Sequence, residues 1–305
     1  LLNNADNALG DAAGFEMDAA MVQVVMLDVS ARIDVNAAPE EALAALNAAL
    51  AMHAPLEPLT VTEGVRKGQK LKLGAKEVAL HEWEVPFPEL ILMARTAEAV
   101  GFDSVWLGDH LLYDLPDGSV RGPWEVWTSL AAIAAVTTRV ELGPLVASIG
   151  FHEPTMLAKQ AATVDAISGG RLIVGLGAGW NEREYRAFGF PFDQRVSRFE
   201  EAFGLIRRLL AGETVDYAGR FYDVVGGCID PISRPGGPPL MVGSTAPRML
   251  SMTLPYVQSW NVWWSRFGNT VGGFAREAAR VEELAQQAGR APRRGDRRHV
   301  VQMLG

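Results

Sequence analysis

Hydrophobic and polar positions alternate along residues 88–304 with two periods, one typical of helices and one typical of strands. From 88 to 100, apolar side chains recur every three or four residues, and 104–108 is a short apolar run typical of a buried strand. The same order then repeats, with further helices predicted at 127–136, 154–167, 196–210, 246–254 and 275–288, and further strands at 140–146, 172–176, 239–243, 257–263 and 300–304. This alternation predicts parallel strands joined by crossover helices, in an open doubly wound sheet or a closed barrel.

Seven strands are predicted when residues 71–75 are taken as the opening strand. A complete (β/α)8 barrel has eight, so a barrel built from this chain lacks its eighth strand–helix unit. Residues 1–70 have no place in the pattern. We therefore expect an N-terminal extension of uncertain structure at 1–70, followed by a C-terminally truncated (β/α) barrel domain at 71–305.

A run of alternating glycines, Gly175, Gly177 and Gly179, follows the predicted strand at 172–176. A buried parallel strand that ends in backbone without side chains lets a flat or phosphorylated ligand lie against the peptide planes, with free N–H groups to hold it. The nicotinamide-binding fingerprint differs, because it reads G-x-G-x-x-G and opens a helix. The run therefore predicts a cofactor site, with an ordinary tight turn as the alternative.

A second candidate ligand site lies between a predicted strand and a predicted helix, at 243–248. Pro247 suits a first helical turn, where backbone N–H groups are free to bind an anion. The hydroxyls of Ser244 and Thr245 and the guanidinium of Arg248 would complete a phosphate seat. A helix cap beside a solvated arginine is the alternative.

Composition restricts the class of protein. With 305 residues, 49% of them hydrophobic, the chain can bury a large core, and no apolar stretch is long enough to span a bilayer. A single cysteine, Cys228, excludes a disulfide framework and a cysteine-based metal cluster, which favours a reducing cytoplasm. The net charge of −8 argues against nucleic acid as a partner. Much of it lies in residues 1–70, which hold ten acidic and four basic side chains.

Four segments, taken in chain order, resemble the luciferase-like monooxygenase superfamily: 101–110, 139–143, 168–177 and 239–244. The resemblance extends over residues 71–305. Within the superfamily, 195–202 and 260–264 resemble the members assigned to the deazaflavin coenzyme F420. The resemblance implies a (β/α)8 TIM barrel that binds a reduced flavin or deazaflavin at the carboxyl ends of its strands.

The resemblance also implies roles for individual residues. Asp109 and His110 end the second strand and would face the cofactor ring, where an imidazole can donate a hydrogen bond and move a proton. A loop cap is the alternative for this pair. A non-prolyl cis peptide behind the ring would join Leu145 to Val146. The residues expected to bind the cofactor are Leu145, Val146, Gly175, Gly177, Gly179, Trp180, Gly243, Ser244, Thr245, Ala246 and Arg248.

Aromatic residues near the predicted strand ends either wall a substrate pocket or simply pack: Trp180, Trp260, Trp263 and Trp264. In the sugar-phosphate dehydrogenases of the superfamily, an acidic residue stands where this chain has Trp180. A sugar phosphate is therefore not the expected substrate. His152, just before a predicted helix, either lines the entrance or caps the helix, and we expect the cap.

The first residues carry a resemblance of their own. Residues 31–46, within a region at 1–55, resemble the start of the periplasmic domain of type II secretion minor pseudopilin K proteins. Asn36 is also an ordinary helix-start signal. The N-terminal segment at 1–70 and the missing eighth strand together predict an assembled or misjoined reading frame. One alternative is that the segment is a flexible acidic extension, and another is that residues 22–27 supply the missing strand.

The sequence thus predicts a cytoplasmic enzyme, an oxidoreductase that transfers a hydride between coenzyme F420 and a small organic substrate. One alternative is a two-component monooxygenase that uses reduced FMN and oxygen, and another is an inactive barrel fragment. The expected partners are a small-molecule substrate, a second copy in a homodimer and a flavin or F420 reductase. Neither nucleic acid nor a membrane is expected, and no metal.

Overall fold

The computed structural model describes residues 77–80, 85–99, 101–115, 117–263 and 271–288. Their central feature is an array of parallel strands: β1 (Glu77–Ala79), β2 (Ser104–Leu107), β5 (Glu141–Pro144), β6 (Ala147–Ser148), β7 (Val174–Gly177), β10 (Leu240–Gly243) and β11 (Ser259–Asn261). β2 pairs with β1 and β5, and β7 pairs with β6 and β10, while a parallel bridge between Leu142 and Leu172 joins the two sets. The strands therefore lie side by side in chain order.

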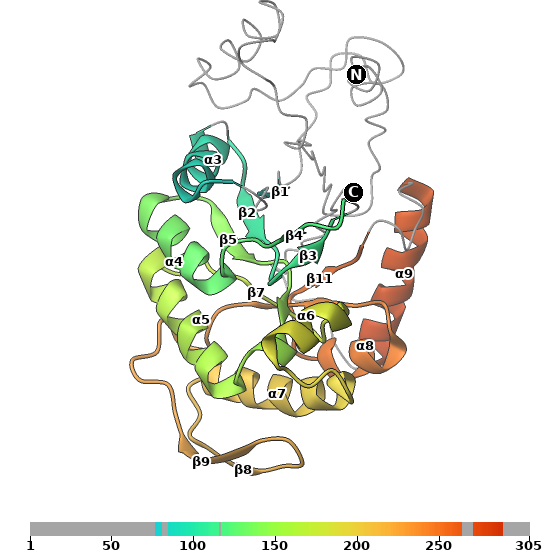
Figure 1. Ribbon diagram of the computed structural model, residues 1–305. Helices are drawn as coiled ribbons and strands as arrows, with labels where there is room; N and C mark the ends of the chain where they lie inside the picture. The colour runs from blue at the N-terminus through green and yellow to red at the C-terminus, as the bar shows by residue number, and fades with distance from the viewer. Residues whose placement is uncertain (1–76, 81–84, 100, 116, 264–270, 289–305) are drawn as a thin grey trace, which may run out of the picture.

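Helices surround these strands in an arc (Figure 1): α3 (Phe87–Ala99), α4 (Val126–Val136), α5 (Pro154–Ser168), α7 (Arg195–Leu210), α8 (Pro247–Thr253) and α9 (Val271–Gln287). A doubly wound sheet has a switch point at which the strand order reverses. No such reversal occurs in the described residues, so the barrel is the correct expectation and the doubly wound sheet is wrong.

Smaller elements decorate this framework. They are the hairpin β3 (Tyr113–Asp114) and β4 (Val120–Arg121), the 3-10 turn η2 (Ile149–Phe151), helix α6 (Glu182–Phe188), and the hairpin β8 (Val215–Ala218) and β9 (Asp223–Gly227). The β8–β9 hairpin projects outside the ring of helices, beyond α5 and α7, whereas α6 lies within the arc (Figure 1).

The core has two layers. The outer layer packs the apolar helix faces against the strands and includes Phe199, Phe203, Ile206 and Leu210, the stripe that the α7 periodicity predicts. The inner cluster comprises Trp106, Leu145, Ile173 and Met241, with Val146 packed against it. Inside it, the indole nitrogen of Trp106 donates a 2.8 Å hydrogen bond to the hydroxyl of Ser104, so the ring buries no unpaired donor.

The expected element order is confirmed in most of the chain, with a few differences. The third strand is divided into β5 and β6, and the peptide bond between Leu145 and Val146, which lies between them, is cis, as the resemblance implies. β7 begins two residues later than predicted, and α9 begins four residues earlier. α6 and both hairpins were missed. The strands predicted at 71–75 and 300–304 lie outside the described residues.

Arg171 fixes the helices at the amino ends of the strands. Its guanidinium donates to the carbonyls of Ser168, Val140 and Ala134, at 2.7, 2.7 and 2.8 Å. It also donates to the carbonyl and the hydroxyl of Thr137, at 2.8 and 2.9 Å. One side chain thus satisfies carbonyls at the ends of both α4 and α5, which have no partner within their helices.

We predict that Arg171→Met lowers the free energy of unfolding by about 2–4 kcal/mol, because it leaves several carbonyls without a partner while retaining an apolar stem. Arg186→Met is the matched control, since Arg186 is 76% exposed and, among the described residues, pairs with Glu182 alone, on its own helix. Chemical denaturation measures both. A loss below about 0.5 kcal/mol for Arg171→Met would show that water replaces its contacts.

Candidate functional site

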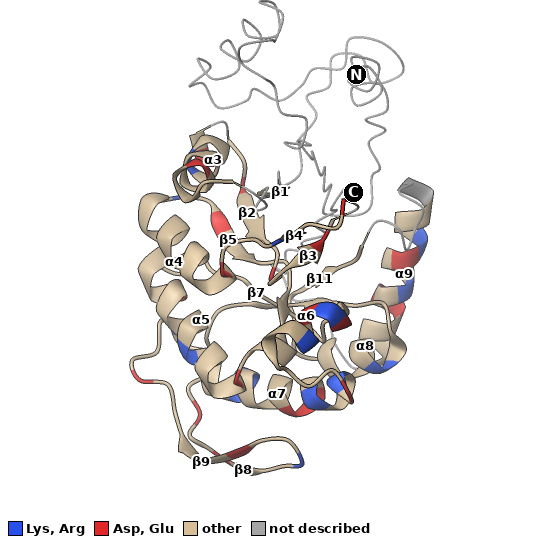
Figure 2. Cartoon of the chain, viewed as in Figure 1, with Lys and Arg blue, Asp and Glu red and all other residues tan. Residues whose placement is uncertain are grey.

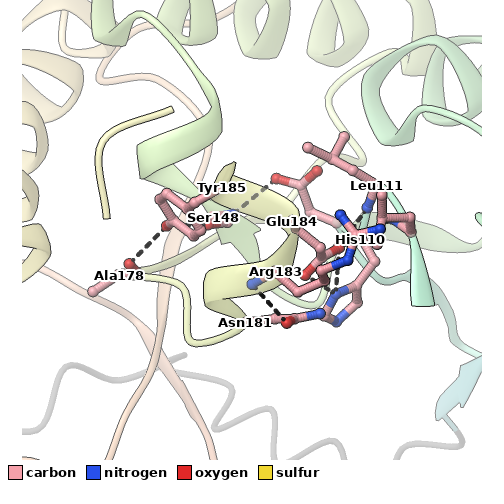
Figure 3. Close-up of polar contacts among 10 residues, drawn as sticks. His110, Leu111, Ser148, Ala178, Asn181, Arg183, Glu184 and Tyr185 are labelled. Atoms are coloured by element: carbon pink, nitrogen blue, oxygen red, sulfur yellow. Dashed lines mark hydrogen bonds and ion pairs between the residues drawn. The ribbon is translucent and has the colours of Figure 1, made fainter. Parts of the chain in front are cut away.

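His110 lies just beyond the carboxyl end of β2, and a buried carboxylate holds its ring. Its Nδ1 is 3.1 Å from Oε2 and 3.2 Å from Oε1 of Glu184, on α6 (Figure 3). The Glu184 side chain is 1% exposed, whereas the His110 side chain is 18% exposed. Within the part of the chain described, Nε2 makes no hydrogen bond. The ring therefore keeps one nitrogen available beside solvent.

Glu184 is ionised at neutral pH although it is buried. Burial raises the pKa of Glu184, but hydrogen bonds from His110 and from the backbone N–H groups of Leu111 and Leu112 outweigh that effect. The pKa of Glu184 therefore lies below its ordinary value. The two backbone donors lie 2.6 and 3.3 Å from Oε1. The same carboxylate thus holds the imidazole and the backbone that follows it.

Asp109 points elsewhere. It is 5% exposed, and its Oδ2 accepts the backbone N–H of Ser148 at 2.8 Å and lies 2.7 Å from Nε2 of His152. These contacts fix β6 to the end of β2. Asp109 and His110 thus bind different elements, Asp109 binding β6 and His152 and His110 binding α6, and their contact with the cofactor ring stays a prediction.

The expectation that His152 caps the helix at 154 is wrong, because the N-cap of α5 is Glu153. The backbone N–H of His152 instead ends the preceding turn η2, where it donates to the carbonyl of Ile149 at 3.0 Å. Its side chain, however, is bound to Asp109 and is 14% exposed. The end of β2 therefore carries two imidazole–carboxylate pairs, one directed toward α6 and the other toward β6 and η2.

Tyr185 anchors α6 from the residue next to Glu184. Its ring is fully buried, and its hydroxyl lies 2.9 Å from the hydroxyl of Ser148 and 3.1 Å from the carbonyl of Ala178 (Figure 3). Burial raises the pKa of Tyr185, so the phenol is neutral at neutral pH and can donate. A side chain at Gly179, which has φ of 74°, would collide with Tyr185 and with Ser148. This glycine is therefore required by packing.

The other glycines surround Val146. A Cβ at Gly177 would lie 2.6 Å from a methyl of Val146, one at Gly243 would lie 2.8 Å from it, and one at Gly175 would lie 3.0 Å from the other methyl. The distances at Gly177 and Gly243 are shorter than real contacts, and at Gly175 a Cβ would collide first with the carbonyl oxygen of Pro144. The expected open backbone surface is therefore filled by Val146 at Gly177 and by Pro144 at Gly175.

The segment from Gly243 to Arg248 is a strand end followed by a helix start, as expected, and the Ser244 hydroxyl accepts the N–H of Ala246 at 3.1 Å. Arg248, however, donates to Glu200 at 2.6 Å and lies 3.2 Å from the hydroxyl of Ser197. Its guanidinium is therefore directed at α7 and already has an anionic partner. Figure 2 shows basic and acidic positions along α7 and a basic position on α8.

The tryptophans separate into two groups. Trp260 is a packing residue, because it is 7% exposed and its indole N–H donates to the carbonyl of Ser244 at 2.7 Å. Trp180 is 68% exposed, and its ring meets that of His110 edge-on at 5.9 Å. Trp263 is 45% exposed, and Trp264 lies outside the described residues.

Sequence reasoning missed Glu184, Tyr185 and Ser148 as site residues, and it missed the side-chain role of His152. The one available signal was Asn181, whose side chain accepts the N–H of Arg183 at 3.2 Å and caps α6. That cap predicts a helix after the glycines. It does not tell which acidic residue of the helix faces inward.

The luciferase-like monooxygenase family model matches residues 65–303. The chain belongs to this family. It is 36% identical over 142 residues to the F420-dependent glucose-6-phosphate dehydrogenase of Amycolatopsis mediterranei, which covers 45% of this chain and 42% of that one. It is 30% identical over 209 residues to a phthiodiolone/phenolphthiodiolone dimycocerosates ketoreductase of Mycobacterium tuberculosis, which covers 62% of this chain and 55% of that one.

Two solved structures show the shared fold. An F420-dependent secondary alcohol dehydrogenase in complex with an F420–acetone adduct has a TM-score of 0.59 at 23% identity, covering 71% of this chain and 64% of that one. The FMN-bound oxygenating constituent of the Pseudomonas putida 3,6-diketocamphane monooxygenase has a TM-score of 0.56 at 20% identity, covering 70% and 60%. The chain spans less than two thirds of each of these four relatives.

Other expectations remain as they were. The pseudopilin resemblance and the extension at 1–70 fall on residues outside the described part and stay predictions. In the residues that are described, no helix is both long and apolar enough to cross a membrane.

We predict that Glu184→Gln lowers the free energy of unfolding at pH 7. The difference in unfolding free energy between the wild type and the variant then narrows as the pH falls below about 4.5. A carboxyl with a lowered folded-state pKa stabilises the fold above its unfolded value, ordinarily 4.5, and loses that contribution as the pH falls through the folded value. Denaturation curves of both proteins at several pH values measure the gap. A gap that stays constant down to pH 3 would contradict the shift.

Proposed function

We propose that this protein is an oxidoreductase that transfers a hydride between coenzyme F420 and a small organic substrate. The observation that carries the proposal is His110, held by Glu184 at the carboxyl end of β2 with Nε2 free, beside the exposed ring of Trp180. The carboxyl end of the strands is where barrel enzymes place their catalytic groups. Two family relatives whose names state F420 dependence support this choice of cofactor.

The residues present fit such a cofactor. Ser244 and Thr245 provide hydroxyl donors for an anionic tail, and the guanidinium of Arg280 lies 3.4 Å from the carbonyl of Thr245. Arg248 would join them only by leaving its ion pair with Glu200 on α7. Val146 presents an apolar side chain beside the strand ends, which suits a flat ring. A bound deazaflavin would supply two-electron hydride transfer, since carbon replaces the reactive nitrogen of flavin.

Each residue then has a defined task. His110 holds or moves a proton at Nε2, which has no hydrogen-bond partner among the described residues. Glu184 orients the ring, and Tyr185 and Asp109 hold α6 and β6 against the strand end from which His110 extends. Trp180 lies edge-on to the His110 ring and would limit the access of water to it. The substrate itself, a cytoplasmic location and a separate reductase partner remain expectations.

A two-component monooxygenase that uses reduced FMN and oxygen is the second candidate. A relative of this fold is described with FMN, so the framework alone is compatible with either ring system. The inactive fragment is the third, and it requires that neither cofactor binds.

We predict that coenzyme F420 binds more tightly than FMN, with a dissociation constant at least about tenfold lower, which corresponds to about 1.4 kcal/mol. Titration of the purified protein with each cofactor, followed by tryptophan and cofactor fluorescence, measures both constants. Trp180 is exposed and should report on binding. Micromolar FMN binding without F420 binding would favour the monooxygenase, and binding of neither would favour the inactive fragment.

We also propose a homodimer that forms through α4 and its neighbours. α4 carries no charged residue, and Figure 2 shows its ribbon without acidic or basic positions. Exposed apolar side chains lie on it and on the flanking helices: Leu92, Val136, Met156 and Ile167. A helix without charged residues, flanked by large exposed apolar side chains, suits contact with another protein surface.

We predict that Val136→Glu converts the dimer into a monomer, because it places one charge per copy in the proposed apolar contact. Val136 is 43% exposed, so the folded monomer tolerates the change. Val225→Glu is the matched control on the projecting β9, where the side chain is 88% exposed. Sedimentation of the three proteins tests the proposal, and a wild type that sediments as a monomer refutes it.

A further inference from the structure

We propose that Glu184 is a positioning residue that dictates which nitrogen of His110 carries the proton. In this arrangement Nδ1 is protonated and bound to the carboxylate, and Nε2 of the neutral ring keeps a lone pair directed away from it. The inference rests on the proposed function, in which His110 moves a proton, and it names the group that prepares His110 for that task.

The chemistry of the two partners sets the tautomer. An ionised carboxylate can only accept hydrogen bonds, so a ring nitrogen that faces it must carry a hydrogen. Both carboxylate oxygens of Glu184 lie within 3.2 Å of Nδ1 of His110, and neither contacts Nε2. Neutral imidazole carries one N–H group. The proton on Nδ1 therefore leaves Nε2 as an acceptor.

The carboxylate is held in place independently of the imidazole. Oε1 of Glu184 accepts the backbone N–H groups of Leu111 and Leu112, at 2.6 and 3.3 Å. Tyr185, the next residue on α6, is anchored to Ser148 and to the carbonyl of Ala178 on two other segments of the barrel. Removal of the imidazole would therefore leave the carboxylate where it is, which is the property of a positioning group.

The neighbouring charges do not compete for His110. On the same helix, Glu182 pairs with Arg186 at 2.7 Å, and Arg183 pairs with Asp114 at 3.3 Å. Glu184 is the one carboxylate within ion-pair distance of His110 in the described residues. The ring is also confined on its sides by Tyr113, with centroids 4.7 Å apart, and by Trp180 at 5.9 Å.

An isosteric substitution separates the chemical role from the structural one. In Glu184→Gln, the amide oxygen can still accept the N–H of Leu111, which leaves the amide NH2 group to face Nδ1 of His110. The NH2 group then stands at the position of Oε2, the oxygen nearer to Nδ1 at 3.1 Å, and it donates. This favours Nδ1 as the acceptor and moves the proton to Nε2. The shape of the site is retained while the tautomer reverses.

The first experiment requires neither cofactor nor substrate. The full chain, labelled with 15N at histidine, is examined by long-range 1H–15N correlation spectroscopy above the pH range in which imidazole titrates. The signals of His110 are identified by their loss in His110→Asn. We expect the wild type to show protonated Nδ1 and Glu184→Gln to show protonated Nε2, with Glu182→Gln, the matched control on the same helix, unchanged from the wild type.

A wild type with protonated Nε2, or with equal amounts of the two tautomers, overturns the inference without any variant. A Glu184→Gln protein that keeps the wild-type tautomer overturns it as well. Both results stand whether or not F420 binds, so failure of this inference is distinguishable from failure of the proposed function.

The second experiment measures turnover, with reduced F420 and a panel of small ketones and enones. We expect Glu184→Gln to lower kcat by about 10²-fold while the KM for the cofactor changes less than about threefold, because the variant alters proton transfer more than binding. His110→Ala should show a similar loss, and the double variant should lose no more than either single one. A fully additive double variant would show that Glu184 acts apart from His110.

Discussion

The burial of two consecutive side chains, Glu184 and Tyr185, is the constraint on which the mouth of this barrel depends. They point to different neighbours from one short helix: the carboxylate to the end of β2, and the phenol to β6 and to the segment that follows β7. Three strand ends that are far apart in sequence are thereby held to one element. A buried charge is tolerated because several donors surround it.

The two ends of the strands are built for different purposes. At the amino ends, Arg171 satisfies helix carbonyls, and Glu98 accepts the backbone N–H groups of 138–140. The Arg171 guanidinium and the Glu98 carboxylate are thus both bound to backbone groups of the protein itself. At the carboxyl ends, His110 keeps a free nitrogen and Trp180 an exposed ring. Charged side chains at the amino ends thus stabilise the fold, whereas those at the carboxyl ends leave groups exposed to solvent. In barrels of this kind the amino-terminal face generally serves stability and the carboxyl-terminal face generally carries the active site.

Periodicity predicted the framework well, because the long helices bury one apolar face and strands such as β7 and β10 are short apolar runs. Helix α6 escaped prediction, since its residues 182–184 and 186 are all charged and only Tyr185 and Glu184 are buried. A helix that buries a carboxylate gives no hydrophobic stripe. The same reasoning applies to Asp109 and His110. The sequence predicted that both follow a strand, but their different directions depend on contacts with β6 and α6, which lie far away in the sequence.

The glycine run shows that a sequence motif can be located correctly while the reason for its glycines is misinterpreted. The absence of side chains at Gly175, Gly177 and Gly179 was interpreted as backbone left open for a ligand, yet neighbouring groups use that room, and at Gly177 the neighbour is the Val146 side chain. A substitution at Gly177 would therefore act first by displacing Val146, since a Cβ there lies 2.6 Å from its methyl group. Any effect on a ligand would be transmitted through an apolar side chain rather than through a lost N–H contact. The glycines and Val146 consequently form one unit, and the surface that Val146 presents, not the bare backbone, is what a flat ring would meet.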